Sequence, residues 1–274
     1  MNALTAFELL VKDGDSRYAL APESSAFLVS TRPSFLGGLF RHISTQLLPR
    51  WLKLNEVIRT GSSSTDVTRQ SAELFQQQVE DLYAMSYPAA QTLVEVLGVR
   101  TTEREINVLD LEAGSGVLSV TLAQASPHVR VTAIDWPDVL PVTRRVAERY
   151  GVADRFRFIE GDLIRADFGS GYNIATLGHV LHSETEEWSL VLLKKTFDAL
   201  VSGGTIAIVE AFTNEDRTGP PHALILAVQM LTHASRGEVL SFGELNRRLR
   251  RAGFQVAQTV ETPSPFPIVL AKKP

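Results

Sequence analysis

The alternation of short apolar runs with helical segments after residue 100 constrains the fold more than any other feature. The runs are rich in β-branched residues, and a helical or looped stretch follows each of them. They are INVLDL (106–111), VRVTAID (129–135), FRFIEGD (156–162), YNIATLG (172–178) and GTIAIVEA (204–211). Because strands that alternate with helices build parallel sheets covered on both faces, the sequence predicts a doubly wound α/β sheet.

The end of the chain departs from this alternation. Residues 254–263 and 266–274 are two strand-like runs without a helix between them, and a Pro-Ser-Pro segment joins them. Such runs predict an antiparallel strand pair at the edge of the sheet.

The start of the chain has a different pattern. Residues 36–61 and 71–99 carry apolar side chains at helical spacing, and the Ser-rich breaker GSSST separates the two segments. We therefore expect a mostly helical region over residues 1–100, followed by the sheet domain over residues 101–274.

Composition excludes several classes of protein. Lys and Arg total 27 against 31 Asp and Glu, and the net charge of −4 argues against nucleic-acid binding. The basic run RRLRRAGF (247–254) has no aromatic platform beside it and is interpreted as a solvated helix face. Without cysteine the chain has no disulfide and no cysteine-ligated metal, and with no apolar run of membrane-spanning length we expect a cytoplasmic protein.

A glycine-bearing turn follows the first predicted strand. Gly114 and Gly116 lie between that strand and a helix, where open α/β sheets bind ligands. About 20 residues later Asp135 ends the second strand, and a carboxylate there can accept hydrogen bonds from ribose hydroxyls. Together with Trp136, which follows Asp135, these residues predict a nucleoside-cofactor site.

Two kinds of nucleoside cofactor remain open at this point. The segment GSGVLS approaches the dinucleotide pattern G-x-G-x-x-G/A, which keeps NAD as an alternative. Asp110, however, lies ahead of the glycines, where it suits a cationic amino-acid group better than a pyrophosphate. After the third strand, Asp162 can meet an adenine amino group and Leu163 the adenine ring face.

Residues 101–274 resemble class I S-adenosylmethionine-dependent methyltransferases with a Rossmann-like sheet. LGHVLHSETEE, ALVSGGTIAIVEAFTNEDRTGPP, AVQMLTHASRGEVLSFGELNRRLRRAGF and VLAKKP resemble the small-molecule O-methyltransferases that include plant caffeic acid enzymes and bacterial natural-product enzymes. Residues 7–40 resemble the wing and following helices of that family's N-terminal winged-helix dimerisation domain. The resemblance implies S-adenosylmethionine as cofactor, a small hydroxylated aromatic or polyketide-like acceptor from secondary metabolism, and a homodimer with a shortened winged-helix domain.

Glu112 departs from the resemblance, because the family pattern puts Gly or Ala at this position. A buried unpaired carboxylate costs several kcal/mol unless it is paired or protonated. Three interpretations are open. Glu112 turns to a polar neighbour or to water and is tolerated, it pairs with the ammonium or sulfonium charge of the cofactor, or it weakens cofactor binding.

His182 is the candidate catalytic base. The strand YNIATLG leads into a turn, and SETE fits a capping box with Ser183 as N-cap and Glu186 three residues later. This places His182 at the carboxyl edge of the sheet, and a histidine that titrates near neutrality can remove the acceptor's hydroxyl proton. The resemblance makes His182 the family's catalytic histidine and Glu210 the glutamate that orients it. The other histidines show no ligand spacing, and we expect no metal.

The acceptor pocket is assigned from the resemblance. The apolar segment PPHALILAVQMLTHA corresponds to a helix that lines the acceptor site, and Met230 and His233 are the candidate contacts. The second glutamate of the plant enzymes is replaced by Val239, and the adjacent Glu238 is expected to face elsewhere. The base is then held by Glu210 alone, or the site depends more on proximity and desolvation.

Two other functions compete with methyl transfer. Some relatives use the same fold for a non-methylating reaction, with the cofactor absent or structural. The shortened N-terminal domain and Glu112 are also compatible with a non-catalytic partner subunit.

Overall fold

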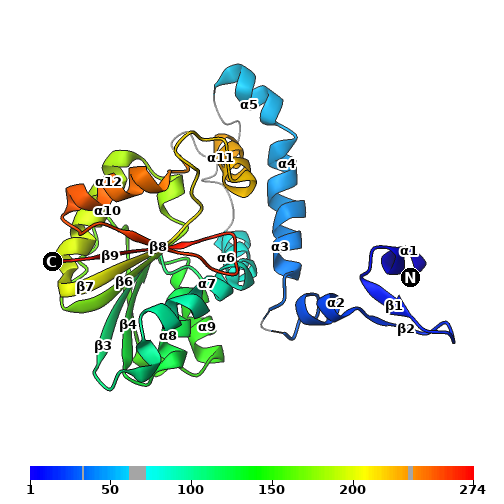
Figure 1. Ribbon diagram of the computed structural model, residues 1–274, viewed down its shortest axis with the longest axis horizontal. Coiled ribbons are helices and arrows are strands. Elements are labelled where there is room, and N and C mark those ends of the chain that lie inside the picture. The colour runs from blue at the N-terminus through cyan, green and yellow to red at the C-terminus, as the bar shows by residue number, and fades with distance from the viewer. Residues whose placement is uncertain (33, 62–71, 234–236) are drawn as a thin grey trace.

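The computed structural model describes residues 1–32, 34–61, 72–233 and 237–274, except for the side chains of residues 72–74 and 233. Figure 1 shows an α/β body that contains both the sheet and the C-terminus, and an N-terminal arm that extends away from it. Within the described residues, no helix is long and apolar enough to cross a membrane.

A seven-stranded sheet forms the centre of the body, in the strand order β5-β4-β3-β6-β7-β9-β8. Its strands are β3 (Ile106–Leu111), β4 (Val129–Asp135), β5 (Phe156–Glu160), β6 (Tyr172–Gly178), β7 (Leu200–Val209), β8 (Gln258–Val260) and β9 (Ile268–Lys272). Strands β3 to β7 pair in parallel, whereas β9 runs antiparallel to both β7 and β8. The predicted doubly wound sheet and its antiparallel terminal pair are therefore confirmed.

Strand β3 is the topological switch point of the sheet. It pairs with β4 on one side and with β6 on the other. The connections that leave β3 and β6 therefore run to opposite sides, which opens a crevice beyond the carboxyl ends of these strands. Ligands of open α/β sheets bind in this crevice, so the fold places the glycine turn after β3 at the centre of the candidate site.

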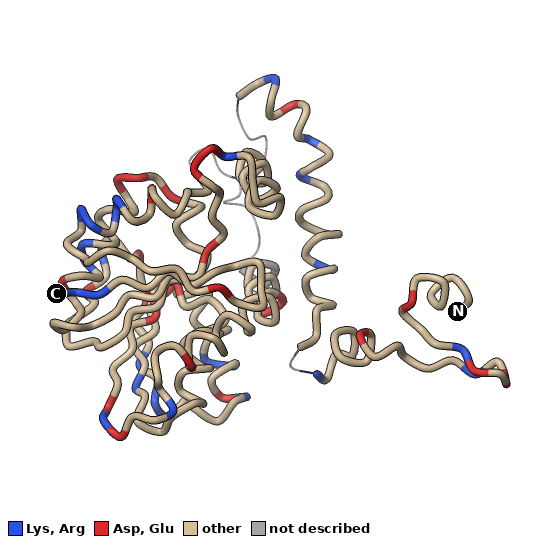
Figure 2. Tube along the Cα trace, in the orientation of Figure 1, with Lys and Arg blue, Asp and Glu red and all other residues tan. Residues whose placement is uncertain are grey.

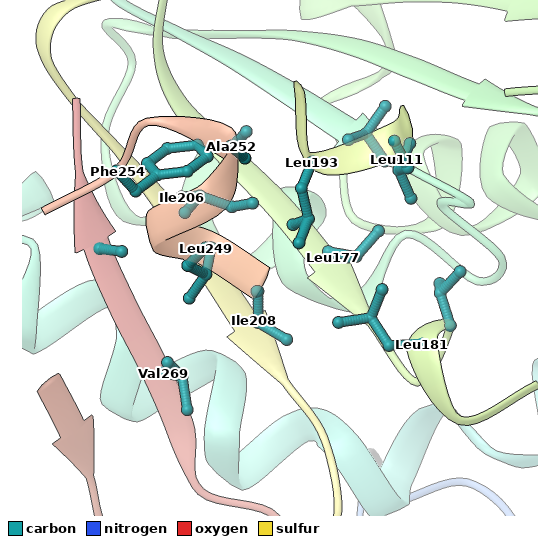
Figure 3. Close-up of a cluster of buried hydrophobic side chains, with 14 of the residues drawn as sticks. Leu111, Leu177, Leu181, Leu193, Ile206, Ile208, Leu249, Ala252, Phe254 and Val269 are labelled. Carbon is teal, nitrogen blue, oxygen red and sulfur yellow. The ribbon is translucent and has the colours of Figure 1, made fainter. Parts of the chain in front are cut away.

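Helices cover both faces of the sheet, and the side-chain alternation along β3 shows why. Leu109 and Leu111 join the core cluster under α10 (Glu186–Ala199) and α12 (Phe242–Ala252), whereas Val108 joins the cluster under α7, α8 and α9. Those three helices are α7 (Tyr83–Val96), α8 (Val117–Ala125) and α9 (Leu140–Arg149). Figure 3 shows the first cluster, in which strand side chains such as Leu177 and Ile206 lie near Leu249 of α12.

The core of the body reaches across residue 100. Leu93 and Val94 of α7 are fully buried in the same cluster as Val108 and Val120. The apolar face of α7, predicted as part of the N-terminal region, therefore covers the sheet. The division of the chain at residue 100 stays a prediction.

The N-terminal arm is mostly helical, as predicted, and begins with a small hairpin. The hairpin strands β1 (Leu10–Lys12) and β2 (Tyr18–Leu20) lie between α1 (Asn2–Ala6) and α2 (Pro22–Phe27). A helical column follows, formed by α3 (Gly37–His42), the π-helical turn η1 (Ile43–Leu47), α4 (Leu48–Trp51) and α5 (Leu54–Thr60). Figure 1 shows the hairpin at the far end of the arm, away from the body.

Two helices lie where the arm meets the body. Helix α6 (Ala72–Asp81) packs against α3, and Arg41 of α3 pairs with Asp81 of α6. Helix α11 (Pro221–His233) lies beside α4 and α5. In the predicted breaker GSSST, Gly61 ends α5 in a left-handed conformation, and residues 62–65 lie outside the described residues.

Candidate active site

The turn after β3 has the backbone that a close ligand approach requires. Gly114 and Gly116 have φ values of 56° and 70°, a region that favours glycine. A Cβ atom on Gly116 would lie 2.9 Å from Cγ2 of Thr143, so a larger residue would force the packing of α9 to move. Gly116 is the N-cap of α8, which brings the start of that helix to the crevice.

Asp110 is buried at the end of β3 and is held by two hydroxyl groups. Ser119 of α8 donates to its Oδ2 at 2.5 Å, and Thr176 of β6 donates to its Oδ1 at 2.6 Å. Burial raises the pKa of Asp110 to about 7, although both hydroxyl groups act in the opposite direction. The carboxyl group is therefore fixed by α8 and β6 at the wall of the crevice.

Asp135 closes the turn from the end of β4. Its two oxygens accept hydrogen bonds from the backbone N–H groups of Gly114 at 2.8 Å and of Trp136 at 2.7 Å. Burial raises the pKa of Asp135 to about 6 against the effect of these donors. The Trp136 side chain is 51% exposed and lies at the surface.

A cavity of about 160 Å³ lies at the carboxyl end of β3. Its walls include Asp110 and Glu112, the backbone of the glycine turn, and two residues that the sequence analysis did not select, Ser86 and His179. Ligand pockets usually measure about 300–1,000 Å³, so this cavity matches one end of a nucleoside cofactor rather than the whole of it.

Glu112 lines this cavity with a left-handed backbone, at a φ of 49°. Burial raises the pKa of its carboxyl group to about 8, and the negative charges of Asp135, Glu184 and Asp162 act in the same direction. The part of the chain that the structure describes offers the Glu112 carboxyl no hydrogen-bond donor. At neutral pH the protonated form is therefore favoured, which reduces the cost of placing this side chain here.

The end of β5 places the two residues predicted to meet adenine. Asp162 is partly exposed and accepts a hydrogen bond from the backbone of Ile164 at 2.8 Å. Leu163 is 3% exposed and packs in the core cluster with Leu111 and Leu177. Of the two side chains, Asp162 is the one available to solvent.

The turn before α10 differs from the predicted capping box. Ser183 belongs to the short 3-10 helix η5 (Leu181–Ser183), and its hydroxyl donates to the carbonyl of Val180 at 2.8 Å. Thr185 has the extended backbone that an N-cap requires, and its hydroxyl accepts from Trp188 N–H at 3.2 Å. The prediction of Ser183 as N-cap with Glu186 as its partner is therefore wrong, because η5 delays the start of α10.

A complete capping box occurs elsewhere, at the start of α12. Ser241 and Glu244 exchange side-chain and backbone hydrogen bonds there. The S-x-x-E spacing in SFGE was the signal that could have located it.

His182 and Glu210 meet at the carboxyl ends of β6 and β7. Nδ1 of His182 lies 2.8 Å from Oε1 of Glu210, which also accepts from Ala211 N–H at 3.0 Å. Burial disfavours the charged forms of both His182 and Glu210, but the attraction between the two charges is the larger effect. The pKa of His182 is therefore raised and that of Glu210 is lowered, which favours an imidazolium next to a carboxylate.

A second histidine, His179, shares the same carboxylate. Its Nδ1 lies 3.8 Å from Oε1 of Glu210, and its Nε2 lies 2.8 Å from the Ser86 hydroxyl on α7. The ring packs edge-on against Phe266 with centroids 4.5 Å apart. Sequence reasoning missed this group because Ser86 and His179 are 93 positions apart, although the His-x-x-His spacing was visible.

The predicted acceptor contacts lie on α11. Met230 is 6% exposed and packs with Ala211, Ala223 and Val239, and the side chain of His233 lies outside the described residues. Glu238 pairs with Arg217 at 2.8 Å and lies 3.8 Å from Arg248. Val239 is buried in this apolar cluster, so position 239 supplies no carboxylate to His182.

A larger cavity of about 700 Å³ lies between α3, α6 and α9. Several of its charged side chains pair with one another, as Arg149 does with Glu80 at 2.5 Å and Arg41 does with Asp81. None of the predicted site residues lines it. Among residues with described side chains, no group of three or more His, Cys, Asp or Glu could hold a metal ion.

The sheet order and the glycine turn at the carboxyl end of β3 are the arrangement of an α/β enzyme that binds a nucleoside cofactor. A family model for the O-methyltransferase domain matches residues 60–255, and the chain belongs to this family. S-adenosylmethionine is the family's cofactor, which confirms the resemblance seen in the sequence.

Several characterised proteins are similar over nearly the whole chain. The methyltransferase PigF of a Serratia species is 29% identical over 99% of this chain and 80% of its own length. The 3-hydroxy-5-methyl-1-naphthoate 3-O-methyltransferase of Streptomyces sahachiroi is 27% identical, over 97% and 77%. The tetracenomycin polyketide synthesis 8-O-methyl transferase TcmO of Streptomyces glaucescens is 26% identical, over 100% and 81%.

Solved structures show the same fold. PigF with S-adenosylhomocysteine superposes with a TM-score of 0.79 at 28% identity, over 99% of this chain and 83% of that chain. Human N-acetylserotonin methyltransferase with S-adenosylmethionine superposes with a TM-score of 0.85 at 20% identity, over 99% and 81%.

Proposed function

We propose that this chain transfers a methyl group from S-adenosylmethionine to a hydroxyl group of a small aromatic or polyketide-like metabolite in secondary metabolism. The observation that carries the proposal is the contact of His182 with the buried Glu210, 2.8 Å apart, on the same sheet edge as the glycine turn. Relatives named for a naphthoate and for a polyketide pathway support this class of acceptor.

The residues at the crevice fit the cofactor chemically. The left-handed glycines leave room for it at the turn, and oxygen acceptors stand at the ends of three adjacent strands. We assign Asp110, Gly114 and Gly116 to the amino-acid part and Asp135 and Trp136 to the ribose side. Asp162 is assigned to adenine, with the buried Leu163 behind it. When bound, S-adenosylmethionine supplies an electrophilic methyl group on a positively charged sulfur. A positive charge lowers the pKa of neighbouring carboxyl groups, so the carboxyl groups around the cavity can ionise beside such a cation.

His182 is the proposed general base. Its Nδ1 is held by Glu210, so Nε2 is the ring nitrogen that accepts the proton from the acceptor hydroxyl. Glu210 keeps the ring in one orientation and stabilises the imidazolium that forms, because its carboxylate is buried and lies in direct contact. Removal of the proton leaves an oxygen with the electron density that attack on the methyl group needs.

The test uses the intact chain with S-adenosylmethionine and a panel of naphthols, catechols and hydroxylated anthraquinones. We expect formation of S-adenosylhomocysteine together with a methylated product by mass spectrometry, and its loss in His182→Ala. Turnover of an acceptor without any methyl donor would instead favour a non-methylating enzyme. Binding of the cofactor without turnover of any acceptor would favour a partner subunit.

We also propose that two copies of the chain associate through the arm. Its helical column carries large apolar side chains in contact with solvent, among them Leu52 at 79%, Ile58 at 68% and Phe40 at 58% exposure. Figure 2 shows basic positions spaced along this column, with uncharged stretches between them. Contiguous exposed apolar surface of this kind marks a protein interface, and a second copy with the same arm matches it.

A further inference from the structure

Glu210 is a buried carboxylate with two histidine neighbours rather than one. Its Oε1 lies 2.8 Å from Nδ1 of His182 and 3.8 Å from Nδ1 of His179. His179 in turn lies 2.8 Å from the Ser86 hydroxyl through Nε2. The four side chains form one network that runs from α7 to the proposed base.

The outer half of this network is firmly placed. Ser86 is 4% exposed on α7, whose apolar face is buried against the body. The His179 ring packs on Phe266, and its backbone has a φ of 59°, which fixes the direction in which the side chain leaves the chain. The ring therefore cannot turn away from Glu210 without losing packing and the contact with Ser86.

The neighbours of His179 determine which ring nitrogen carries the proton. At 3.8 Å, Nδ1 of His179 is too far from Glu210 for a hydrogen bond, but an N–H on Nδ1 points its positive end toward the carboxylate, which favours this tautomer of a neutral ring. Nε2 is then an acceptor, and the Ser86 hydroxyl donates to it. Burial lowers the pKa of His179, and the charge of His182 acts in the same direction against the attraction of Glu210. Of the two rings, His182 is the one that takes the charge.

The Glu210 carboxylate lacks a full set of hydrogen-bond donors. Its Oε2 is buried and has no hydrogen-bond partner among the described residues. A buried ionised carboxylate is costly unless donors surround it. Val239 is apolar and buried, and Glu238 is paired with Arg217, so neither residue brings a second carboxylate to His182. The His179 ring lies next to the same carboxylate, and Ser86 of α7 contacts that ring.

We propose that Ser86 and His179 are a positioning pair that keeps Glu210 ionised and aimed at His182, in place of a second carboxylate. This proposal rests on the proposed function, because its effect is exerted through His182 as the base. It assigns a role in the active site to α7, a helix outside the predicted sheet domain.

The test compares Ser86→Ala, His179→Ala and His179→Asn with the unaltered chain. Asn tolerates the left-handed backbone at position 179 and offers an amide N–H near the place of Nδ1, so it is the conservative variant. Thr196→Val is the matched control, because it removes another fully buried hydroxyl, one that donates within α10 at 2.8 Å. Thermal unfolding establishes that each variant is folded.

The main measurement is the ¹⁵N NMR titration of the His182 ring, which needs no acceptor and is assigned by loss of the signal in His182→Asn. The titratable neighbours of His182 are Glu210 from β7 and His179. We expect the midpoint of His182 to fall in Ser86→Ala and His179→Ala, because Glu210 is less well held, and to recover in His179→Asn. Thr196→Val should titrate as the unaltered chain does.

The kinetic measurement uses a naphthol probe that the unaltered chain methylates. Loss of one buried hydrogen bond is expected to lower kcat about tenfold, which is a larger effect than on the Kd for S-adenosylhomocysteine, although Ser86 and His179 both line the cavity. An unchanged His182 midpoint in both alanine variants overturns the proposal. A weaker Kd with an unchanged midpoint overturns it too, since the pair would then contact the cofactor only. These two outcomes differ from a failure of the proposed function, in which His182→Ala would leave methyl transfer intact.

Discussion

Replacement of Glu210 by glutamine tests how His182 is activated. The substitution keeps the shape and one acceptor oxygen, so the hydrogen bond from Ala211 N–H is retained, but it removes the negative charge beside Nδ1 of His182. A hydrogen bond to a charged group contributes about 1.5–3 kcal/mol and a neutral one about 0.5–1.5 kcal/mol. The difference of about 1–1.5 kcal/mol corresponds to a rate lowered about 5- to 13-fold.

The pH dependence of kcat/KM shows in which direction Glu210 shifts the pKa of His182. Against the effect of burial, Glu210 raises the pKa of His182, and a base must be deprotonated to act. Without the carboxylate the pKa of His182 falls, so the acidic limb of the kcat/KM profile moves to lower pH. The plateau value of kcat/KM also falls, because His182 is then a weaker base.

The assay measures S-adenosylhomocysteine formation from pH 5 to 9 with a naphthol acceptor, and Glu238→Gln is the control. Glu238 is a neighbouring glutamate that pairs with Arg217 rather than with His182, so its loss should leave both plateau and limb in place. A Glu210→Gln variant with an unaltered plateau and an unaltered acidic limb would refute the assignment of Glu210 as the partner of the base.

Three further predictions follow from the site and the arm. His182→Ala should lower kcat by about 10²- to 10⁴-fold and leave calorimetric binding of S-adenosylhomocysteine in place. Burial and neighbouring carboxylates raise the pKa of Glu112 to about 8 on folding. The protonated side chain therefore contributes its full share to the free energy of unfolding below the unfolded pKa, and this contribution is lost as the pH rises through 8. Glu112→Gln should therefore raise Tm more at pH 9 than at pH 5, and an equal change at both pH values would contradict the burial argument. Leu52→Glu, which puts a charge on the exposed column, should shift light scattering from dimer to monomer, whereas Lys53→Glu should not.

Much of the sheet could be predicted because its signal is local. The β-branched runs marked β3 to β6 at the predicted residues, and the absence of a helix between β8 and β9 indicated their antiparallel pairing. The inclusion of α7 in the body could not be predicted from such local signals. Helical spacing shows that α7 has an apolar face, but only the tertiary structure shows that the sheet covers that face.

The site residues likewise fall into those that the local sequence predicts and those that depend on the tertiary structure. Asp110, the glycine turn and Asp135 follow from strand ends, and the structure brings them together around one turn. The cap of α10 was misplaced because Ser183 and Thr185 are both good N-cap residues, and the intervening η5 decides between them. His179 and Ser86 were missed because their contact depends on how α7 docks, which no local pattern encodes.

Calorimetric titration of the unaltered chain with S-adenosylmethionine tests the central claim most directly, with Glu112→Gly in parallel. The account predicts micromolar binding by the unaltered chain, about −8 kcal/mol, since the raised pKa of Glu112 leaves its side chain largely neutral at pH 7. Binding by Glu112→Gly alone would contradict the account, because the natural residue at position 112 would then exclude the cofactor on which methyl transfer depends.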